Sequence, residues 1–188
     1  MRRKLTILLL LANPLLLMAQ GQNLEIDTGK SNIQVQGTST IHDWDMETKL
    51  INGNTYLVKK ESVLVISKTN ISIKATNLKG DISGMDDKAY EALKVKKHPN
   101  ITFSQTNELE LHSTGKNFKG TIKGNLTISG KTKAVSIPIT ANTLQNQLIV
   151  EGEIALKMTS FNIEPPRAML GTIKAEDNIK INFELILK

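Results

Sequence analysis

The stretch FKGTIKGNLTISGKTKAVSIPI, residues 118–139, decides the fold. Apolar residues take every second position on both sides of a short polar segment, Ser129-Gly130-Lys131. Successive side chains of a β-strand point to opposite faces, so this pattern predicts two half-buried strands joined by a tight turn. The alternating residues are Ile122, Leu126 and Ile128 before the turn, and Val135, Ile137 and Ile139 after it.

The same alternation recurs along most of the chain, and we count eight to ten strands. One face of each strand is apolar and the other polar, and residues such as Gly, Asn and Lys separate many of them, as in antiparallel hairpins. The remaining alternating segments are Ile33 and Val35, Met46 and Leu50, residues 62–67 (SVLVIS), Ile71 and Ile73, Ile101 and Phe103, Leu148 to Met158 with Gly152 among them, and Ile179 to Leu187.

An open sheet with this many strands would leave unpaired edges, whereas closure removes the edges and gathers the apolar faces inside. The sequence therefore predicts an all-β protein, an antiparallel closed barrel of eight (eight to ten) strands. A barrel of eight strands is either filled by its side chains or holds one small ligand. A two-sheet sandwich has the same periodicity and stays open as an alternative.

One segment departs from the β pattern and predicts a short helix around residues 84–97. Met85, Ala89 and Leu93 recur at spacings of four and share a face. Ser83 and Asp86 have the spacing of a capping box, and the pair His98-Pro99 ends the helix. We expect this helix to cover one side or end of the barrel.

The N-terminus has the order of a secretory signal peptide. Arg2, Arg3 and Lys4 precede an apolar run over residues 5–17, and Met18-Ala19-Gln20 follows. An uncleaved membrane anchor is the alternative, but the run is short for a bilayer. We expect residues 1–20 to be the signal peptide and 21–188 one domain, periplasmic or secreted. The chain has no Cys, so neither a lipid-carrying Cys nor a disulfide is available.

Composition narrows the function classes. Removal of the leader would lower the net charge from +6 to +3. Basic residues alternate with acidic and amide residues, and no Arg-rich or aromatic-basic stretch occurs, so we expect no nucleic-acid partner. The domain is not expected to be an integral membrane protein.

The segment STIHDWDMET, residues 39–48, combines a hydroxyl, an imidazole and carboxylates. A hydrolase built on Ser39, His42 and Asp43 would need an oriented base and an oxyanion hole, and no G-x-S-x-G elbow is present. His42 and Asp43 would also diverge on a regular strand. A metal site would need a bulge that gathers these residues with others; the further candidates are Asp45, His98 and His112.

A structural corner explains the segment better. Trp44 and Met46 share a parity with Thr48 and Leu50, so we expect all four to point inward. The position of Ile41 relative to Trp44 predicts a bend or bulge near His42-Asp43. A gate at the mouth of a ligand site is a second interpretation of this corner.

Three motifs in order resemble the YceI-like family. They are the helix running into H-P-x-I-x-F at residues 98–103, G-x-L-T-I-x-G-x-T-K at 124–133, and the C-terminal segment LKMTSFNIEPPRAMLGTIKAEDNIKINFELIL. The resemblance covers residues 24–188. It implies a periplasmic or secreted, lipocalin-like barrel of eight antiparallel strands that holds a polyisoprenoid chain. Lys30, Met158 and Asn162 stand where the family commonly has His, Arg and Gly, which affects the expected ligand more than the fold.

The resulting expectation is an exported binding protein, not an enzyme, that holds a polyisoprenoid, an isoprenoid quinone or another lipid for transport, storage or sequestration. The alternative is a filled barrel that serves as a structural or interaction module of the cell envelope. A hydrolase or metal site at His42 ranks below both. We expect no catalytic residue, metal or cofactor beyond such a lipid, and a homodimer is allowed.

The expected site residues fall into two groups. His42 and Arg167 are expected at the head group or mouth, because a guanidinium suits an anionic head group. The expected apolar lining consists of Trp44, Met46, Phe103, Leu126, Ile154, Leu156, Met158, Phe161, Met169 and Phe183.

Overall fold

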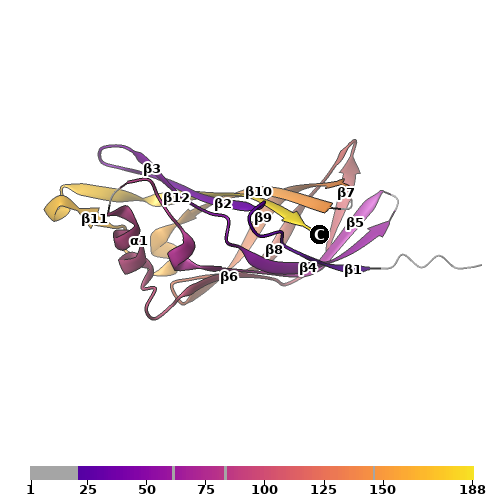
Figure 1. Ribbon diagram of the computed structural model, residues 1–188, viewed down its shortest axis with the longest axis horizontal. Coiled ribbons are helices and arrows are strands. Elements are labelled where there is room, and N and C mark those ends of the chain that lie inside the picture. Colours follow the sequence, from indigo (N-terminus) through magenta and orange to yellow (C-terminus); the bar gives the residue numbers. More distant parts are fainter. Residues whose placement is uncertain (1–20, 61, 83, 146) are drawn as a thin grey trace, which may run out of the picture.

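The computed structural model describes residues 21–60, 62–82, 84–145 and 147–188. The described chain forms one large antiparallel sheet, one α-helix and three 3-10 turns (Figure 1). The strands are β1 (Gln22–Glu25), β2 (Asn32–Ser39), β3 (Asp43–Thr48), β4 (Asn52–Lys60), β5 (Val63–Lys74), β6 (Asn100–Gln105), β7 (Leu109–Thr114), β8 (Asn117–Ile128), β9 (Lys131–Leu144), β10 (Gln147–Lys157), β11 (Arg167–Ala168) and β12 (Ile173–Leu187). The helix is α1 (Met85–Leu93), and the 3-10 turns are η1 (Ala75–Asn77), η2 (Met158–Phe161) and η3 (Met169–Gly171).

The sheet order is β1-β4-β5-β6-β8-β9-β10-β12-β2-β3. β7 lies between β5 and β8 beyond the end of β6, because β5 and β8 pair with β6 along one part of their length and with β7 along another. The longest ladder joins β8 to β9, the two strands predicted from residues 118–139. The turn between them places Ser129 and Gly130 at positive φ.

Backbone hydrogen bonds link each of the two end strands, β1 and β3, to a further segment of the chain. β1 pairs with β4, and the chain just beyond β1 forms a bridge from Ile26 to Leu187 of β12. Nearer α1, Glu47 of β3 exchanges backbone hydrogen bonds of 2.8 and 2.9 Å with Lys79. The predicted all-β antiparallel barrel with one helix is confirmed.

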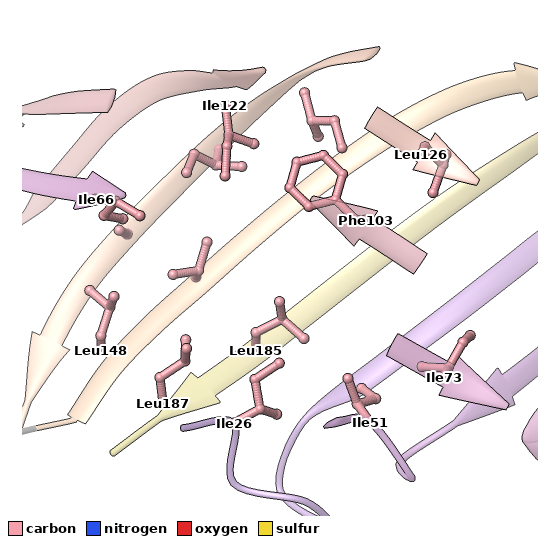
Figure 2. Packing of buried hydrophobic residues seen from close by; sticks show 14 of the residues in the cluster. Ile26, Ile51, Ile66, Ile73, Phe103, Ile122, Leu126, Leu148, Leu185 and Leu187 are labelled. Carbon is pink, nitrogen blue, oxygen red and sulfur yellow. The ribbon is translucent and has the colours of Figure 1, made fainter. Parts of the chain in front are cut away.

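The inward faces of the strands form a single apolar cluster. Figure 2 shows part of it, with Ile66, Phe103 and Leu185 pointing from different strands into the space between them. In β12 the odd-numbered residues from Ile179 to Leu187 are more shielded than the charged Lys180 and Glu184. The period-two pattern therefore identified the inner face of this strand correctly.

The described chain has twelve strands, more than the eight to ten predicted, because the apolar alternation does not indicate β1, β4, β7 and β11. β1 and β11 are only four and two residues long. The alternation predicts separate strands over residues 62–67 and Ile71–Ile73, but both lie in β5, which begins at Val63. Lys68 has φ +55°, and the register with β4 shifts there by one residue. This β-bulge moves the inward positions from even to odd numbers, which makes one strand look like two.

The helix is shorter than predicted. The Lys94 N–H donates to the Glu91 carbonyl and the Val95 N–H to the Tyr90 carbonyl, at 3.0 and 3.1 Å, with Lys94 left-handed. This Schellman arrangement ends α1 at Leu93. Ser83 of the predicted capping box lies outside the described residues.

The expected inward position of Leu50 is wrong. β3 ends at Thr48, so Leu50 no longer follows the alternation of that strand, and its side chain is exposed.

None of the helices in the described part of the chain is long and apolar enough to cross a bilayer.

Candidate ligand-binding cavity

A cavity of about 630 Å³ lies inside the barrel, and α1 forms part of its wall. This volume is typical of sites that enclose a small organic ligand. The cavity does not run the full length of the barrel. Near β1, the β4–β5 hairpin and β7, the interior is packed by buried side chains that do not line the cavity, namely Leu24, Ile51, Leu57, Leu64 and Leu111.

The residues expected at the site lie as follows. Both mouth candidates, His42 and Arg167, line the cavity. Leu156 packs against the buried cluster but does not line the cavity. The other expected apolar residues all line it: Trp44, Met46, Phe103, Leu126, Ile154, Met158, Phe161, Met169 and Phe183.

Several lining residues were not anticipated from the sequence. The inner face of α1 contributes Met85, Lys88, Ala89 and Ala92. The spacing of Met85, Ala89 and Leu93 predicts the helix, but only tertiary packing decides that this face meets the cavity instead of a solid core. Ala175 was also missed, because a small residue within a strand carries little signal of its own.

Polar lining residues gather at two places. Ser39, His42, Lys88 and Arg167 lie at the α1 end, and the lining within the described residues contains no carboxylate. Deeper in the barrel, Thr55 and Thr69 are buried and their hydroxyls lie 2.7 Å apart. The Thr69 hydroxyl also donates to Gln105 Oε1 at 2.7 Å.

These threonines sit at the bulge in β5, where Thr55 of β4 faces the extra residue. Gln105 completes the arrangement by donating to the backbone carbonyls of Ile66 and Asn107, at 2.9 and 2.7 Å. The network satisfies polar groups that would otherwise be buried without partners. It lies where the cavity gives way to the packed half of the barrel, so it forms a polar floor in an otherwise apolar site.

Three aromatic residues that line the cavity lie against glycines on neighbouring strands. Trp44 lies over Gly37, Phe103 over Gly124, and Phe183 over Gly152. Each of these glycines occupies an inward-facing strand position, where the alternation would otherwise place an aliphatic side chain. The missing side chains let the rings lie against the wall, which leaves the centre of the barrel open.

We expect Gly37→Ala to move the Trp44 ring off the wall. The new methyl group would overlap the ring, whose Nε1 donates to the Thr38 carbonyl at 3.1 Å. Overpacking of this kind costs about 1–3 kcal/mol in free energy of unfolding. Trp44 is the only tryptophan, so its fluorescence emission should change. In a Trp44→Leu background, Gly37→Ala should cost much less; equal costs in both backgrounds would contradict the interpretation.

The segment 39–48 consists of the turn of the β2–β3 hairpin and strand β3. The Ser39 hydroxyl donates to the His42 carbonyl at 2.8 Å and accepts from the His42 N–H at 3.3 Å. The His42 Nδ1 donates to the backbone carbonyl of Asp43 at 2.8 Å. Both side chains thus hold the turn, which is the predicted corner, and they do not form the base–nucleophile pair of a hydrolase. Among the described residues, no three His, Asp or Glu side chains come close enough to hold a metal ion.

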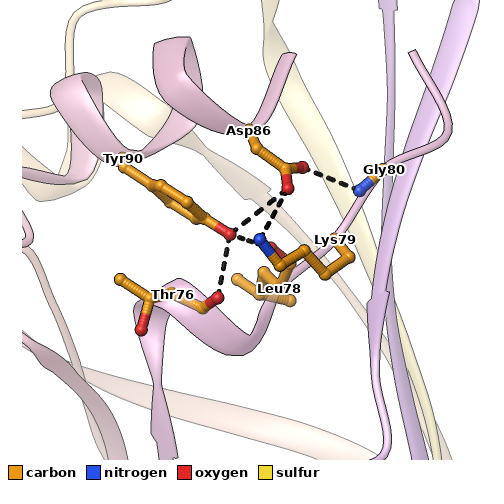
Figure 3. A network of polar contacts seen from close by, with 6 residues as sticks. All are labelled: Thr76, Leu78, Lys79, Gly80, Asp86 and Tyr90. Atoms are coloured by element: carbon orange, nitrogen blue, oxygen red, sulfur yellow. Dashed lines mark hydrogen bonds and ion pairs between the residues drawn. The ribbon is translucent and has the colours of Figure 1, made fainter. Parts of the chain in front are cut away.

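A polar network holds α1 against the chain that leaves β5 (Figure 3). Asp86 Oδ2 lies 2.8 Å from Lys79 Nζ, and Asp86 Oδ1 accepts from the Gly80 N–H at 3.0 Å. The Tyr90 hydroxyl lies 2.8 and 2.7 Å from the carbonyls of Thr76 and Leu78. The Lys79 ammonium, followed by the Gly80 N–H, holds the pKa of Asp86 below its usual range, and Asp86 in turn raises the pKa of Lys79.

This network predicts a pH dependence of stability. The folded-state pKa of Asp86 lies below its unfolded value of 3.8, so its contribution is present above pH 3.8 and is lost as the pH falls through the folded pKa. Asp86→Asn should lower the melting temperature by a few degrees at pH 6. The difference between wild type and variant should vanish at low pH, where Asp86 is protonated. A difference that stays constant from pH 6 to pH 2 would contradict this role.

The three departures from the family pattern each have a definite structural setting. Asn162 has φ +57°, a conformation that Gly adopts most easily and Asn next. Lys30 lies 3.5 Å from Asp27, which also pairs with Lys188 at 3.1 Å next to the bridge between Ile26 and Leu187. Met158 is buried and lines the cavity, so an apolar side chain replaces a charge there.

Comparison with solved structures finds the same fold at low sequence identity. BcnA of Burkholderia cenocepacia is 17% identical with a TM-score of 0.68, over 86% of this chain and 98% of that chain. A polyisoprenoid binding domain from Saccharophagus degradans is 10% identical with a TM-score of 0.67, over 88% and 97%. The Campylobacter jejuni YCEI protein is 19% identical with a TM-score of 0.52, over 64% and 71%.

Comparison with curated proteins finds no match to this chain. The family model of the YceI-like domain matches residues 24–187, which span β1 to β12. The chain therefore belongs to the YceI-like family.

Proposed function

We propose that this protein binds a single lipid with an apolar chain, a polyisoprenoid, an isoprenoid quinone or a similar molecule, inside the barrel. The cavity of about 630 Å³, lined almost entirely by aliphatic and aromatic side chains, carries the proposal. Each CH₂ group of a ligand buried there contributes about 0.8 kcal/mol. One structural neighbour is described as a polyisoprenoid binding domain, which supports the same ligand class.

The orientation of the ligand follows from the polar groups of the lining. The apolar chain enters first and extends toward the Thr55–Thr69 floor. Its head group remains at the α1 end, beside His42, Lys88 and Arg167. Lys88 and Arg167 are positively charged, and no carboxylate of the described residues lines the cavity beside them. This arrangement favours an anionic head group such as a phosphate.

The proposal includes export. The residues that predict a signal peptide, 1–20, lie outside the described residues. Removal of this leader would leave the barrel domain in the periplasm or outside the cell, where it would transport, store or sequester its lipid. The filled-barrel module is the second candidate, and the solid packing around Leu64 and Leu111 is the observation that favours it.

Native mass spectrometry of protein purified without detergent from a bacterial periplasm tests the proposal. We expect a mature mass without the leader and one bound lipid per chain, which organic extraction identifies as a polyprenyl compound. A bare mass, together with no uptake of added polyprenyl phosphate or quinone, would overturn lipid binding and leave the filled-barrel module. Retention of residues 1–20 would overturn the export step alone.

Arg167→Gln tests the head-group site. Because Arg167 is exposed at the mouth, its loss should weaken binding of a polyprenyl phosphate by about fivefold, as for a partly solvated charge pair. Binding of the uncharged polyprenol should not change. Lys174→Gln removes the same charge from the opposite position on β12, outside the lining, and serves as the matched control. Equal losses for both lipids or both variants would place the head group elsewhere.

A further inference from the structure

Exposed apolar side chains cluster at the mouth of the cavity. Of the six large hydrophobic residues that the described chain exposes, Ile41, Ile82, Met169 and Leu170 belong to this end. Leu170 is fully exposed, Met169 is 72% exposed and Ile41 is 61% exposed. The other two, Leu50 and Leu144, lie in the β3–β4 connection and at the end of β9.

Three separate segments bring these side chains together. The β2–β3 hairpin carries Ile41, and its Thr40 N–H donates to the Lys174 carbonyl at 3.0 Å, which joins it to the β11–β12 connection with Met169 and Leu170. Ile82 precedes α1 and lines the cavity, as does Met169. In Figure 1 the β2–β3 hairpin, β11 and α1 lie at the same end of the barrel, away from the C-terminus.

The conformation of the β11–β12 connection holds Leu170 outward. Met169, Leu170 and Gly171 have φ values of +49°, +55° and +92° in succession. The left-handed region is unfavourable for Met and Leu, and it is tolerated mainly where the surroundings impose it. Here a short β11–β12 pairing and the preceding Pro165-Pro166 fix the base of the connection. A strained backbone that exposes a leucine to water gives no stability by itself, so it indicates a contact outside the chain.

The charges around the mouth indicate what kind of surface makes this contact. Acidic side chains slightly outnumber basic ones around the mouth, so there is no basic patch that would attract an anionic surface. The charged residues are Lys79, Lys88, Arg167 and Lys174 against Asp43, Asp45, Asp81, Asp86, Asp87 and Glu164. The apolar side chains stand on separate loop tips instead of forming a flat face. Isolated apolar tips suit the fluid interface of a bilayer, which can close around each of them.

We propose that the mouth docks on a lipid bilayer by inserting Ile41, Ile82, Met169 and Leu170, so that the cavity opens toward the membrane. The inference rests on the proposed lipid-binding function, because a lipid with a long apolar chain comes from a bilayer. Docking in this orientation lets the chain pass between membrane and cavity without crossing water. Insertion that needs no basic patch predicts binding to neutral vesicles that depends weakly on salt.

Flotation with phosphatidylcholine vesicles tests the docking. We expect the wild-type domain to float with the vesicles, with similar binding at low and high salt. Leu170→Asp and Ile41→Asp should each lower the partition coefficient at least tenfold. Leu144→Asp is the matched control, since Leu144 is 58% exposed near the C-terminal end of the barrel, where Leu148 pairs with Leu187. Uptake of polyprenyl phosphate from detergent-free solution is measured in parallel for all variants.

The outcomes separate the two proposals. Lipid uptake without vesicle binding, or an equal loss with Leu144→Asp, would overturn docking and leave the lipid-binding function. A concentration-dependent dimer abolished by Leu170→Asp would overturn docking as well, because a second copy of the chain would then cover the mouth. Vesicle binding that requires Leu170 and Ile41, with no lipid uptake, would support docking and overturn the lipid-binding function.

Discussion

Leu111→Ala should destabilise the protein by about 2–5 kcal/mol, the usual cost of opening a new void in a packed core. Leu111 is fully buried in β7 and lies in the half of the barrel that the cavity does not reach. The neighbours that surround it are held by the β5 and β8 ladders, so they have little freedom to collapse into the vacated space.

Ile181→Ala is the matched control for this prediction. It also removes three carbon atoms, but Ile181 already faces the cavity. The substitution enlarges an existing void instead of creating one, and we expect a cost of roughly 1 kcal/mol, the transfer free energy of a half-buried side chain. Urea unfolding of lipid-free protein measures both variants. Equal costs would contradict the division of the barrel into a packed half and a hollow half.

Ala92→Trp should abolish lipid binding, with a loss of affinity greater than tenfold. Ala92 lies on the inner face of α1 and lines the cavity, so an indole ring at this position would occupy space that the ligand needs. Because the ring would extend into the cavity, the free energy of unfolding should change little. Native mass spectrometry with added polyprenyl phosphate gives the affinity, and circular dichroism verifies the fold.

Glu91→Trp introduces the same residue one position earlier, where the side chain is exposed and does not line the cavity. It should bind lipid as the wild type does. Undiminished binding by Ala92→Trp would mean that the ligand does not occupy the cavity beside α1. A loss shared by both variants would instead indicate a general effect of tryptophan on the helix.

Local periodicity accounts for much of the fold. The strands with the clearest alternation, β8, β9, β10 and β12, were predicted from the sequence, as was the helix at α1. β1 and β11 were missed because two to four residues carry too little pattern. β5 was divided in two because the bulge at Lys68 reverses the parity of its inward positions. A bulge depends on the pairing with β4, which local sequence does not encode.

The alternation of apolar residues predicts only part of the candidate site. Inward parity selected Trp44, Met46 and Phe183 as candidates, and they line the cavity. The same parity describes Leu156, which does not line it. Parity gives the face on which a side chain lies but not what it meets there.

The sequence alone determined the class of the fold, because the alternation of apolar and polar residues is a local property that the chain carries along its whole length. Whether the barrel is hollow is decided by tertiary structure. It depends on volumes contributed by strands far apart in the chain, such as the glycines that receive Trp44, Phe103 and Phe183, and on the side chains that fill the opposite half. Packing density is a property of the assembled interior, so a cavity exists only once every strand is in register.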